Sequence, residues 1–326
     1  MKKIKLLLLC TAIAPFMSGV TACSASTDIG ILQYGEFAAL DNARKGFEDG
    51  LKNAGYNLKI DYQNAKANGA TNSTLAKGLA SKKHKLNLAI ATPCATALKA
   101  AQDNIGSQTP LLFTAVTDPV GAKLVQNDKA PEGFVTGSSD MQPAEALNNQ
   151  IKLVKKMIPT ATKLGIFYCA NEQNSQAQAE LASAAAVLEG LDVTTSTCLD
   201  QMDIRQKVGE LAPQVDAIWI PTDNTVANNM SKVKDGLGTN KTLVIVGEEG
   251  MLNGGQLTVS ISYYELGLKT AELAVKVLEG KAISEIPVYY SSADICSNLY
   301  NKQNLEDAGF AVSDLPTDFT WEEYKG

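Results

Sequence analysis

The sequence predicts an α/β protein made of two Rossmann-like lobes, each with a parallel sheet, joined by a three-segment hinge. Apolar strand-like runs alternate with amphipathic stretches along most of the 326 residues, a pattern typical of parallel sheets covered by helices on both faces. The alternation starts a second time near residue 140. A folded part of about 300 residues is also large for a single core and suits two lobes.

The first series of strands and helices occupies residues 28–140. Thr92-Pro93 and Asp118-Pro119 each combine an N-cap residue with proline at the first helical position, and Gly55 is a helix-ending signal. We therefore expect helices to begin at both of these dipeptides. The other expected elements are helices over 39–55 and about 70–83 and strands over 28–34, 58–63, 86–92, 110–116 and 134–140.

The second series begins with a helix over about 143–157. Another helix is expected from Ser175, because Ser175 and Gln178 fit an S-x-x-Q capping box. The expected strands, separated by helices, are 163–170, 191–198, 217–223 and 242–248. Beyond residue 256 we expect a short strand, a helix with apolar residues from 266 to 277, an extended segment over 286–295 and a helix around 300–308.

The order of these elements predicts that the chain passes between the lobes three times, near residues 140, 260 and 290. Three parallel connections would act as a hinge. We assign residues 28–139 plus 264–291 to lobe 1 and residues 140–263 plus 292–326 to lobe 2.

The N-terminus has the features of a secretion signal. Two lysines precede a short apolar run that Pro15 interrupts, and this run is shorter than the roughly 20 residues that a membrane span needs. The segment Val20-Thr21-Ala22-Cys23 resembles the lipobox of bacterial lipoproteins, in which the cysteine is acylated. We expect a signal peptide over 1–22, a lipid on Cys23 and a tether over 23–27. Cleavage by an ordinary secretory peptidase, with Cys23 as an incidental thiol, is the alternative.

Composition argues against several classes of protein. The net charge of −6 gives no electrostatic basis for nucleic-acid binding. His84 is the single histidine, which disfavours Ser-His-Asp and Cys-His catalysis and zinc sites. Neither series contains the glycine fingerprint of dinucleotide sites or a phosphate-binding loop. We expect no enzymatic activity, no cofactor and no metal.

The cysteines of the folded part have no metal-binding spacing. Cys169 and Cys198 end two successive predicted strands, which could be neighbours in a sheet. A disulfide between them and a pair of free buried thiols are both compatible with the sequence.

Ligands of open parallel sheets bind beyond the carboxyl ends of the strands, and this rule selects the candidate site. In lobe 1 it selects Gln33, Tyr34, Phe37, Thr92, Pro93 and the Thr114–Asp118 turn, which includes Thr114, Ala115 and Asp118. In lobe 2 and at the crossing it selects Asn171 to Ser175 (with Asn171, Glu172 and Ser175), Thr222, Asp223, Asn224, Glu248, Ser262 and Tyr263.

These side chains suit a zwitterionic ligand. Helix starts offer free N–H groups to a carboxylate, and acidic side chains such as Glu172, Asp223 and Glu248 could receive an ammonium. Tyr34, Phe37 and the tyrosines at 263–264 could form an apolar or aromatic wall. Alternatively, residues such as Asp118, Asp223 and Ser175 are helix caps, and Tyr264 packs the following helix.

The chain resembles the substrate-binding lipoproteins of ABC importers, in the branch assigned to tryptophan and other aromatic amino acids. The resemblance covers about residues 29–316. It rests on "ALDNARKGF" (39–47), "ATP" (91–93), "FTAVTDPVGAKLV" (113–125), "VTGSSDMQP" (135–143), "PTDN" (221–224), "GGQLTVSISYYELGLKTAELA" (254–274) and "IPVYY" (286–290). The chain departs from the family pattern at Phe37-Ala38, where members often have His-Pro, and at Ser262, where they often have Asp.

The resemblance implies a type I periplasmic binding protein that closes on its ligand by hinge motion. It implies pocket residues at Thr92, 114–118, 171–175, Asp223 and Tyr263. The expected ligand is an L-amino acid, in the first place an aromatic one, and the expected partners are an ABC permease and its ATPase. We expect an extracytoplasmic monomer held at the membrane by its lipid. A sugar or nucleoside ligand, or a role as a sensor for a receptor, is the alternative.

Overall fold

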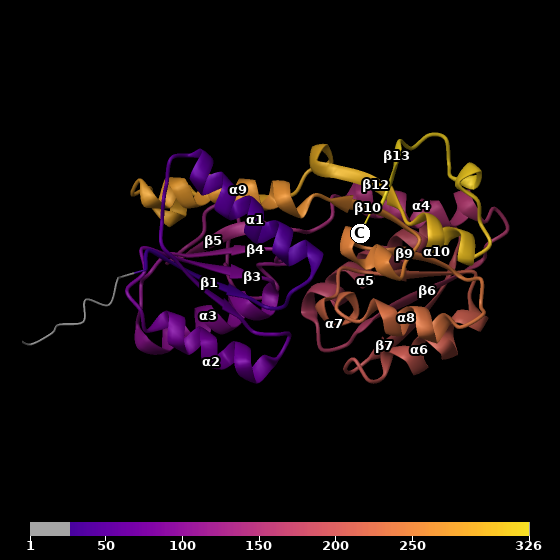
Figure 1. The fold of residues 1–326 in the computed structure, drawn as a ribbon, viewed down its shortest axis with the longest axis horizontal. Helices are drawn as coiled ribbons and strands as arrows, with labels where there is room; N and C mark the ends of the chain where they lie inside the picture. The colour runs from indigo at the N-terminus through magenta and orange to yellow at the C-terminus, as the bar shows by residue number, and fades with distance from the viewer. Residues whose placement is uncertain (1–26, 326) are drawn as a thin grey trace, which may run out of the picture.

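The computed structural model describes residues 27–325 and contains two α/β lobes that lie side by side (Figure 1). The signal peptide, Cys23 and the tether up to residue 26 lie outside the described residues. Within residues 27–325, no helix is long and apolar enough to cross a membrane.

The first sheet has six parallel strands in the order β11-β5-β4-β3-β1-β2. In chain order these are β1 (Ile29–Gln33), β2 (Ile60–Asn64), β3 (Leu86–Ile90), β4 (Leu111–Thr114), β5 (Val135–Ser139) and β11 (Tyr289–Tyr290). The central strands β1, β3, β4 and β5 are buried along their whole length, as expected for a parallel sheet with both faces covered.

Two pairs of helices cover the two faces of this sheet (Figure 1). One face carries α1 (Ala38–Asn53) and α9 (Tyr263–Leu278), and the other carries α2 (Gly69–Ala80) and α3 (Thr92–Ile105). The backbones of α1 and α9 approach closely at Gly46, where an added Cβ would lie 2.0 Å from the carbonyl oxygen of Tyr264. Close packing therefore fixes α9 to lobe 1.

The second sheet has seven strands in the order β13-β12-β10-β9-β8-β6-β7. Its strands are β6 (Lys163–Cys169), β7 (Asp192–Cys198), β8 (Ala217–Ile220), β9 (Leu243–Val246), β10 (Leu257–Ile261), β12 (Cys296–Tyr300) and β13 (Trp321–Glu323). Only the β10–β12 pair is antiparallel among the described strands.

Helices cover both faces of the second sheet as well. One face carries α4 (Ala144–Met157), α5 (Gln173–Leu188) and α10 (Lys302–Asp307), and the other carries α6 (Ile204–Leu211), α7 (Asn224–Ala227) and α8 (Met230–Leu237). Trp219 is fully buried on the first of these faces, where its indole Nε1 donates to Gln150 Oε1. Short 3₁₀ turns lie at Ala212–Gln214, Glu249–Asn253, Ile283–Glu285, Ala293–Ile295 and Val312–Asp314.

Three connections join the sheets, as predicted. They are residues 140–143 between β5 and α4, residue 262 between β10 and α9, and residues 291–295 between β11 and β12. The exact lobe boundaries, 28–139 plus 264–291 and 140–263 plus 292–326, stay a prediction that the membership of the two sheets supports.

Three local expectations are wrong. No helix follows Asp118-Pro119: the Asp118 carboxylate accepts a bond from Gly121 N–H, and the chain continues as turns. Ser175 lies inside α5, whose N-cap is Glu172, so the predicted capping box does not form. Strands β12 and β13 lie where no strand was expected, because their sequences, CSNLY and WEE, carry no continuous apolar run.

Candidate functional site

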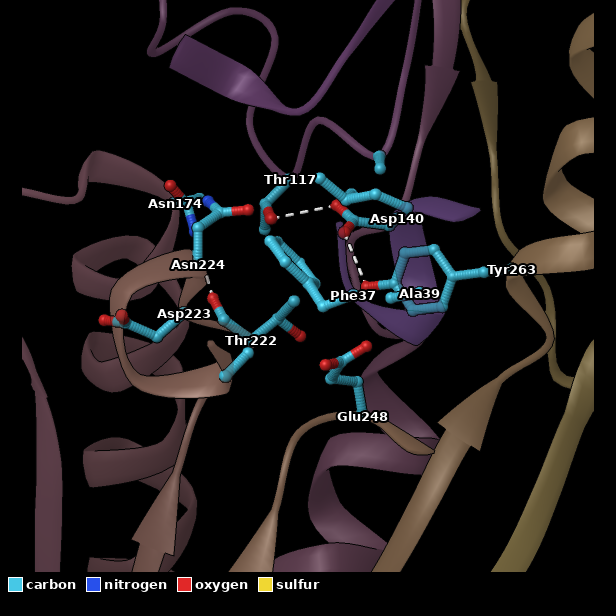
Figure 2. Close-up of a pocket in the computed structure, with 13 residues that line it drawn as sticks. Phe37, Ala39, Thr117, Asp140, Asn174, Thr222, Asp223, Asn224, Glu248 and Tyr263 are labelled. Atoms are coloured by element: carbon cyan, nitrogen blue, oxygen red, sulfur yellow. Dashed lines mark hydrogen bonds between the residues drawn. The ribbon is translucent and has the colours of Figure 1, made fainter. Parts of the chain in front are cut away.

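A pocket lies between the lobes, beyond the carboxyl ends of the parallel strands (Figure 2). Its cavity volume is about 10 Å³, room for roughly one water molecule, so the lining side chains nearly fill it. The predicted residues that line it are Phe37, Ala115, Thr222, Asp223, Asn224, Glu248 and Tyr263, with Thr117 and Asn174 from the predicted turns. Sequence reasoning missed Ala39, Leu40, Asp140 and Ala227.

Asp140 is the most informative of the missed residues. It follows β5 and is 3 % exposed. Its Oδ1 accepts a 2.9 Å hydrogen bond from Thr117 Oγ1, and its Oδ2 accepts a 2.8 Å bond from the Tyr263 hydroxyl (Figure 2). Burial raises the pKa of Asp140, while these two hydrogen bonds act in the opposite direction. The sequence signal that could have identified Asp140 is its position as an acidic residue at the end of a predicted strand.

Glu248 follows β9 and lines the same pocket. The residue is 1 % exposed, and its Oε2 has no hydrogen-bond partner among the described residues. Burial, followed by the charges of Asp140 and Glu249, raises the pKa of Glu248 to about 8. A buried carboxyl with an open oxygen is poised to accept a hydrogen bond from a ligand.

Glu172 and Asp223, in contrast, are occupied by the protein. The Glu172 carboxylate accepts bonds from the backbone and side chains of Asn224 and Thr225, at 2.6–3.0 Å. Asp223 accepts bonds from Cys169 N–H at 2.7 Å and Val226 N–H at 2.8 Å. Asp223 is thus the N-cap of α7, and its carboxylate also holds the end of β6.

Several predicted site residues lie outside this pocket. Gln33 bonds Gly35, Asp41 and Arg44, and the hydroxyl of Thr114 accepts from Ser138 and Thr270. The Ser262 hydroxyl caps α9 by accepting from Glu265 N–H, and Ser175 donates to the Thr222 carbonyl. Thr92 is buried at the start of α3, and Asp118 forms the turn described above.

A second, more open cavity lies beside the pocket and also spans both lobes. Tyr34 and Pro93 line it from lobe 1, and Asn171, Glu172 and Cys169 line it from lobe 2. The candidate residues therefore divide between two neighbouring cavities in the cleft.

The start of α1 forms one wall of the main pocket. Its N-cap, Phe37, has no side-chain acceptor, and the backbone N–H groups of Ala39 and Leu40 donate to no described group. Both residues are buried and line the pocket. The partly buried Phe37 ring points into the pocket beside Thr117 and Thr222 (Figure 2).

The pocket is lined by acidic side chains. Asp140, Asp223 and Glu248 line it, and no lysine, arginine or histidine does so among the described residues. His84 lies elsewhere in lobe 1, between Asn87 and Thr27. Within residues 27–325 no cluster of three or more His, Cys, Asp or Glu side chains could hold a metal ion.

Comparisons with known proteins give the family. Residues 28–315 match the ABC transporter substrate binding protein family. A tyrosine-binding protein from Clostridioides difficile (strain R20291) is 36 % identical over 284 residues, which are 86 % of this chain and 80 % of the relative. Solved structures match as well. One is an ABC domain from Streptococcus pneumoniae in complex with L-Trp, with 32 % identity, a TM-score of 0.82 and coverage of 90 % of this chain and 97 % of that one.

Another solved match is the ligand-free, open structure of a substrate-binding protein with adhesive properties from Clostridium difficile. It shares 33 % identity over 92 % of this chain and 100 % of that one, with a TM-score of 0.68. Together with the two lobes and three connections, these matches identify the fold as that of type I periplasmic binding proteins. The chain belongs to the ABC transporter substrate-binding protein family.

Proposed function

We propose that this substrate-binding protein captures an L-amino acid, in the first place an aromatic one, in the pocket between its lobes. The observation that carries the proposal is the buried Glu248 carboxyl, which lines the pocket and whose Oε2 has no hydrogen-bond partner within residues 27–325. An ammonium group supplies the donors and the positive charge that this oxygen lacks. Asp140 adds a second acidic group to the same pocket.

The carboxylate of the ligand would lie at the start of α1. The N–H groups of Ala39 and Leu40 are buried there and donate to no group within residues 27–325, and a 16-residue helix adds a positive dipole end. Gly250 shows how near the two sites are: a Cβ placed on it would lie 3.3 Å from Glu248 Oε1 and 3.8 Å from Ala39 N. Glu248 Oε1 and Ala39 N are therefore at most 7.1 Å apart (3.3 Å plus 3.8 Å), which is compatible with binding the two charged groups on the α-carbon of one amino acid.

The side chain of the ligand would contact Phe37. Its ring enters the pocket and can stack with an aromatic side chain. The similarity to a tyrosine-binding protein and to a domain solved with L-Trp supports an aromatic ligand.

The arrangement of the lobes supports capture by closure. The chain superposes better on the L-Trp complex, with a TM-score of 0.82, than on the open, ligand-free structure, with a TM-score of 0.68. The sequence identities of 32 % and 33 % are nearly equal and do not account for this difference. The ligand would stabilise the closed arrangement and shift a pre-existing equilibrium towards it. Binding of this kind requires no covalent chemistry, so we expect no enzymatic turnover.

For the physiological role we propose an extracytoplasmic lipoprotein that delivers its ligand to an ABC permease and the associated ATPase. The signal sequence over 1–22 and Cys23 support this location. Two acyl chains on Cys23 would provide stable anchoring of a monomer. Replacement of Cys23 by Ala should release the protein from the membrane or block its processing.

Thermal unfolding with a ligand panel tests the proposed ligand class. A true ligand at 100 times its Kd adds roughly 2.7 kcal/mol to the free energy of unfolding. We expect such stabilisation with an aromatic L-amino acid and none with its D-enantiomer. Stabilisation by a sugar or a nucleoside, with no response to any of the twenty amino acids, would replace the proposed ligand.

A further inference from the structure

Cys169 and Cys198 form a matched pair at the edge of the second sheet. They end β6 and β7 and are directly paired across these parallel strands. Neighbouring strands lie roughly 4.8 Å apart, and paired side chains point to the same face. A disulfide spans Cα separations of about 4.4–6.8 Å, so the backbone already has a suitable spacing.

Both cysteines are buried free thiols. Each thiol donates to a carbonyl oxygen at the end of the other strand: Cys169 Sγ to Leu199 O at 3.5 Å, and Cys198 Sγ to Tyr168 O at 3.8 Å. The other described thiols, Cys94 and Cys296, lack such a pairing.

We propose that Cys169 and Cys198 are a modification site, at which a small-molecule disulfide such as oxidised glutathione converts the two thiols into an intramolecular disulfide. The Cys169 thiolate attacks one sulfur of glutathione disulfide, and the other glutathione leaves as a thiolate that takes up a proton. Cys198 then attacks the Cys169 sulfur, loses its proton and expels the second glutathione. The protein loses two electrons and two protons, and one glutathione disulfide becomes two thiols.

The surroundings assign different roles to the two sulfurs. Cys169, which is 2 % exposed, lines the open cavity between the lobes, whereas Cys198, which is 1 % exposed, does not, so Cys169 is the thiol on the side of the cleft. Interaction with the neighbouring Cys198 thiol, followed by the Asn171 backbone, lowers the pKa of the Cys169 thiol to about 7. The same interaction raises the pKa of Cys198. Cys169 is therefore the attacking thiol and Cys198 the resolving one.

The pair is also close to the proposed ligand pocket, because the backbone of Cys169 bonds Asp223, which lines that pocket. Cys169 N–H donates to the Asp223 carboxylate at 2.7 Å, and Cys169 O accepts from Glu172 N–H at 3.0 Å. A disulfide would thus link the turn before α5, which ends at the N-cap Glu172, to the loop after β7.

The test uses the reduced, folded protein without ligand, so its result does not depend on the proposed ligand. The protein is incubated at pH 8 with oxidised glutathione, alkylated, digested and mapped by mass spectrometry. We expect peptides cross-linked by a Cys169–Cys198 disulfide, which dithiothreitol should reduce. Cys94 and Cys296 should be recovered in the alkylated form, because they were still thiols after the oxidation. Circular dichroism before and after oxidation verifies that the protein stays folded.

Single variants separate the two roles. Cys198→Ala should retain glutathione on Cys169 as a stable mixed disulfide, and the matched control Cys296→Ala should form the cross-link like the unmodified protein. The proposal is overturned if the unmodified protein keeps both cysteines as thiols. It is equally overturned if glutathione stays on Cys169 although Cys198 is present.

Discussion

The hydroxyl of Tyr263 donates a 2.8 Å hydrogen bond to Oδ2 of Asp140 and so joins two of the segments that connect the lobes. Asp140 opens the connection between β5 and α4, and Tyr263 follows the connection at residue 262. Both side chains line the ligand pocket (Figure 2). Under the proposed function, a ligand that contacts this pair would act directly on residues at the hinge, which would link occupancy of the pocket to lobe closure.

Replacement of Tyr263 by Phe should lower the free energy of unfolding by about 1–3 kcal/mol. The change removes the hydroxyl and leaves Oδ2 of the buried Asp140 without its donor. Urea denaturation measures the effect. The matched control is Tyr264→Phe. The Tyr264 hydroxyl donates to Asp49 at the surface, and its loss should lower the free energy of unfolding by less than about 0.5 kcal/mol. Equal effects of the two substitutions would contradict a special role for the Asp140 pair.

Replacement of Glu248 by Gln should weaken amino-acid binding by about ten- to a hundredfold. The amide keeps the shape but loses the charge that would pair with the ligand ammonium, an interaction worth about 1.5–3 kcal/mol. Isothermal titration with the amino acid identified by the panel measures the change. The control is Glu249→Gln, which alters the neighbouring acid outside the pocket. Unchanged affinity in the Glu248 variant would remove the ammonium site from the proposal.

The raised pKa of Glu248 predicts a specific pH dependence of the unliganded protein. Its pKa is about 8 in the folded chain, against an ordinary value of 4.5, and Asp140, Glu249, Tyr263 and Tyr324 are titratable groups that interact with it. The unfolded chain releases this proton first, so the contribution of Glu248 to stability is complete below about pH 4.5. It is lost as the pH rises to about 8.

Chemical denaturation of the unmodified protein and Glu248→Gln between pH 4 and 9 isolates this contribution. The quantity to compare is the free energy of unfolding of the variant minus that of the unmodified protein. Between pH 4 and pH 8 this difference should shift in favour of the variant by a few kcal/mol, because each unit of pKa shift corresponds to about 1.4 kcal/mol. Parallel pH profiles would mean that Glu248 titrates as it does in the unfolded chain.

Sequence patterns predicted most strands and helices because parallel strands buried on both faces read as continuous apolar runs. They failed where that signal is missing. Strand β12 (CSNLY) pairs antiparallel with β10 at the edge region of its sheet and is only partly buried, so its side chains carry no strong apolar pattern. The Asp118 turn failed for another reason, because an N-cap residue before proline also starts turns.

The pocket was predicted as a set of strand ends, but the partners of each side chain were not predictable. Glu172 and Asp223 look like free acids in the sequence, yet backbone and side-chain donors from Cys169 and from residues 224–226 occupy them. Asp140 follows a predicted strand and could have been selected, but its bond with Tyr263, 123 residues away in the chain, could not have been predicted. Contacts of this kind follow from tertiary packing, which local sequence does not encode.

Replacement of Asp223 by Ala should therefore act mainly on stability. The carboxylate accepts bonds from the N–H groups of Cys169 and Val226, and its loss leaves both buried donors unpaired. We expect the free energy of unfolding to fall by about 1–3 kcal/mol, as for other lost caps and buried hydrogen bonds. Thermal and urea unfolding of the unliganded variant measure this. Unchanged stability together with weaker binding would instead identify Asp223 as a ligand contact.

Replacement of Phe37 by Ala should selectively weaken the binding of aromatic amino acids. The ring is partly buried, points into the pocket and makes no capping bond, so its removal should cost the unliganded protein only on the order of 1 kcal/mol. Loss of an aromatic pair should reduce the affinity for an aromatic ligand by about 0.5–1.5 kcal/mol beyond the loss of apolar contact.

The control is Phe37→Leu, which keeps an apolar side chain but removes the ring. Titrations with an aromatic ligand and with an aliphatic amino acid separate the two contributions. The Leu variant should retain the aliphatic affinity and lose part of the aromatic affinity, because only the aromatic ligand can stack on the ring. Tighter aromatic binding to Phe37→Ala would contradict this expectation, because it would mean that the ring occupies the space of the ligand side chain.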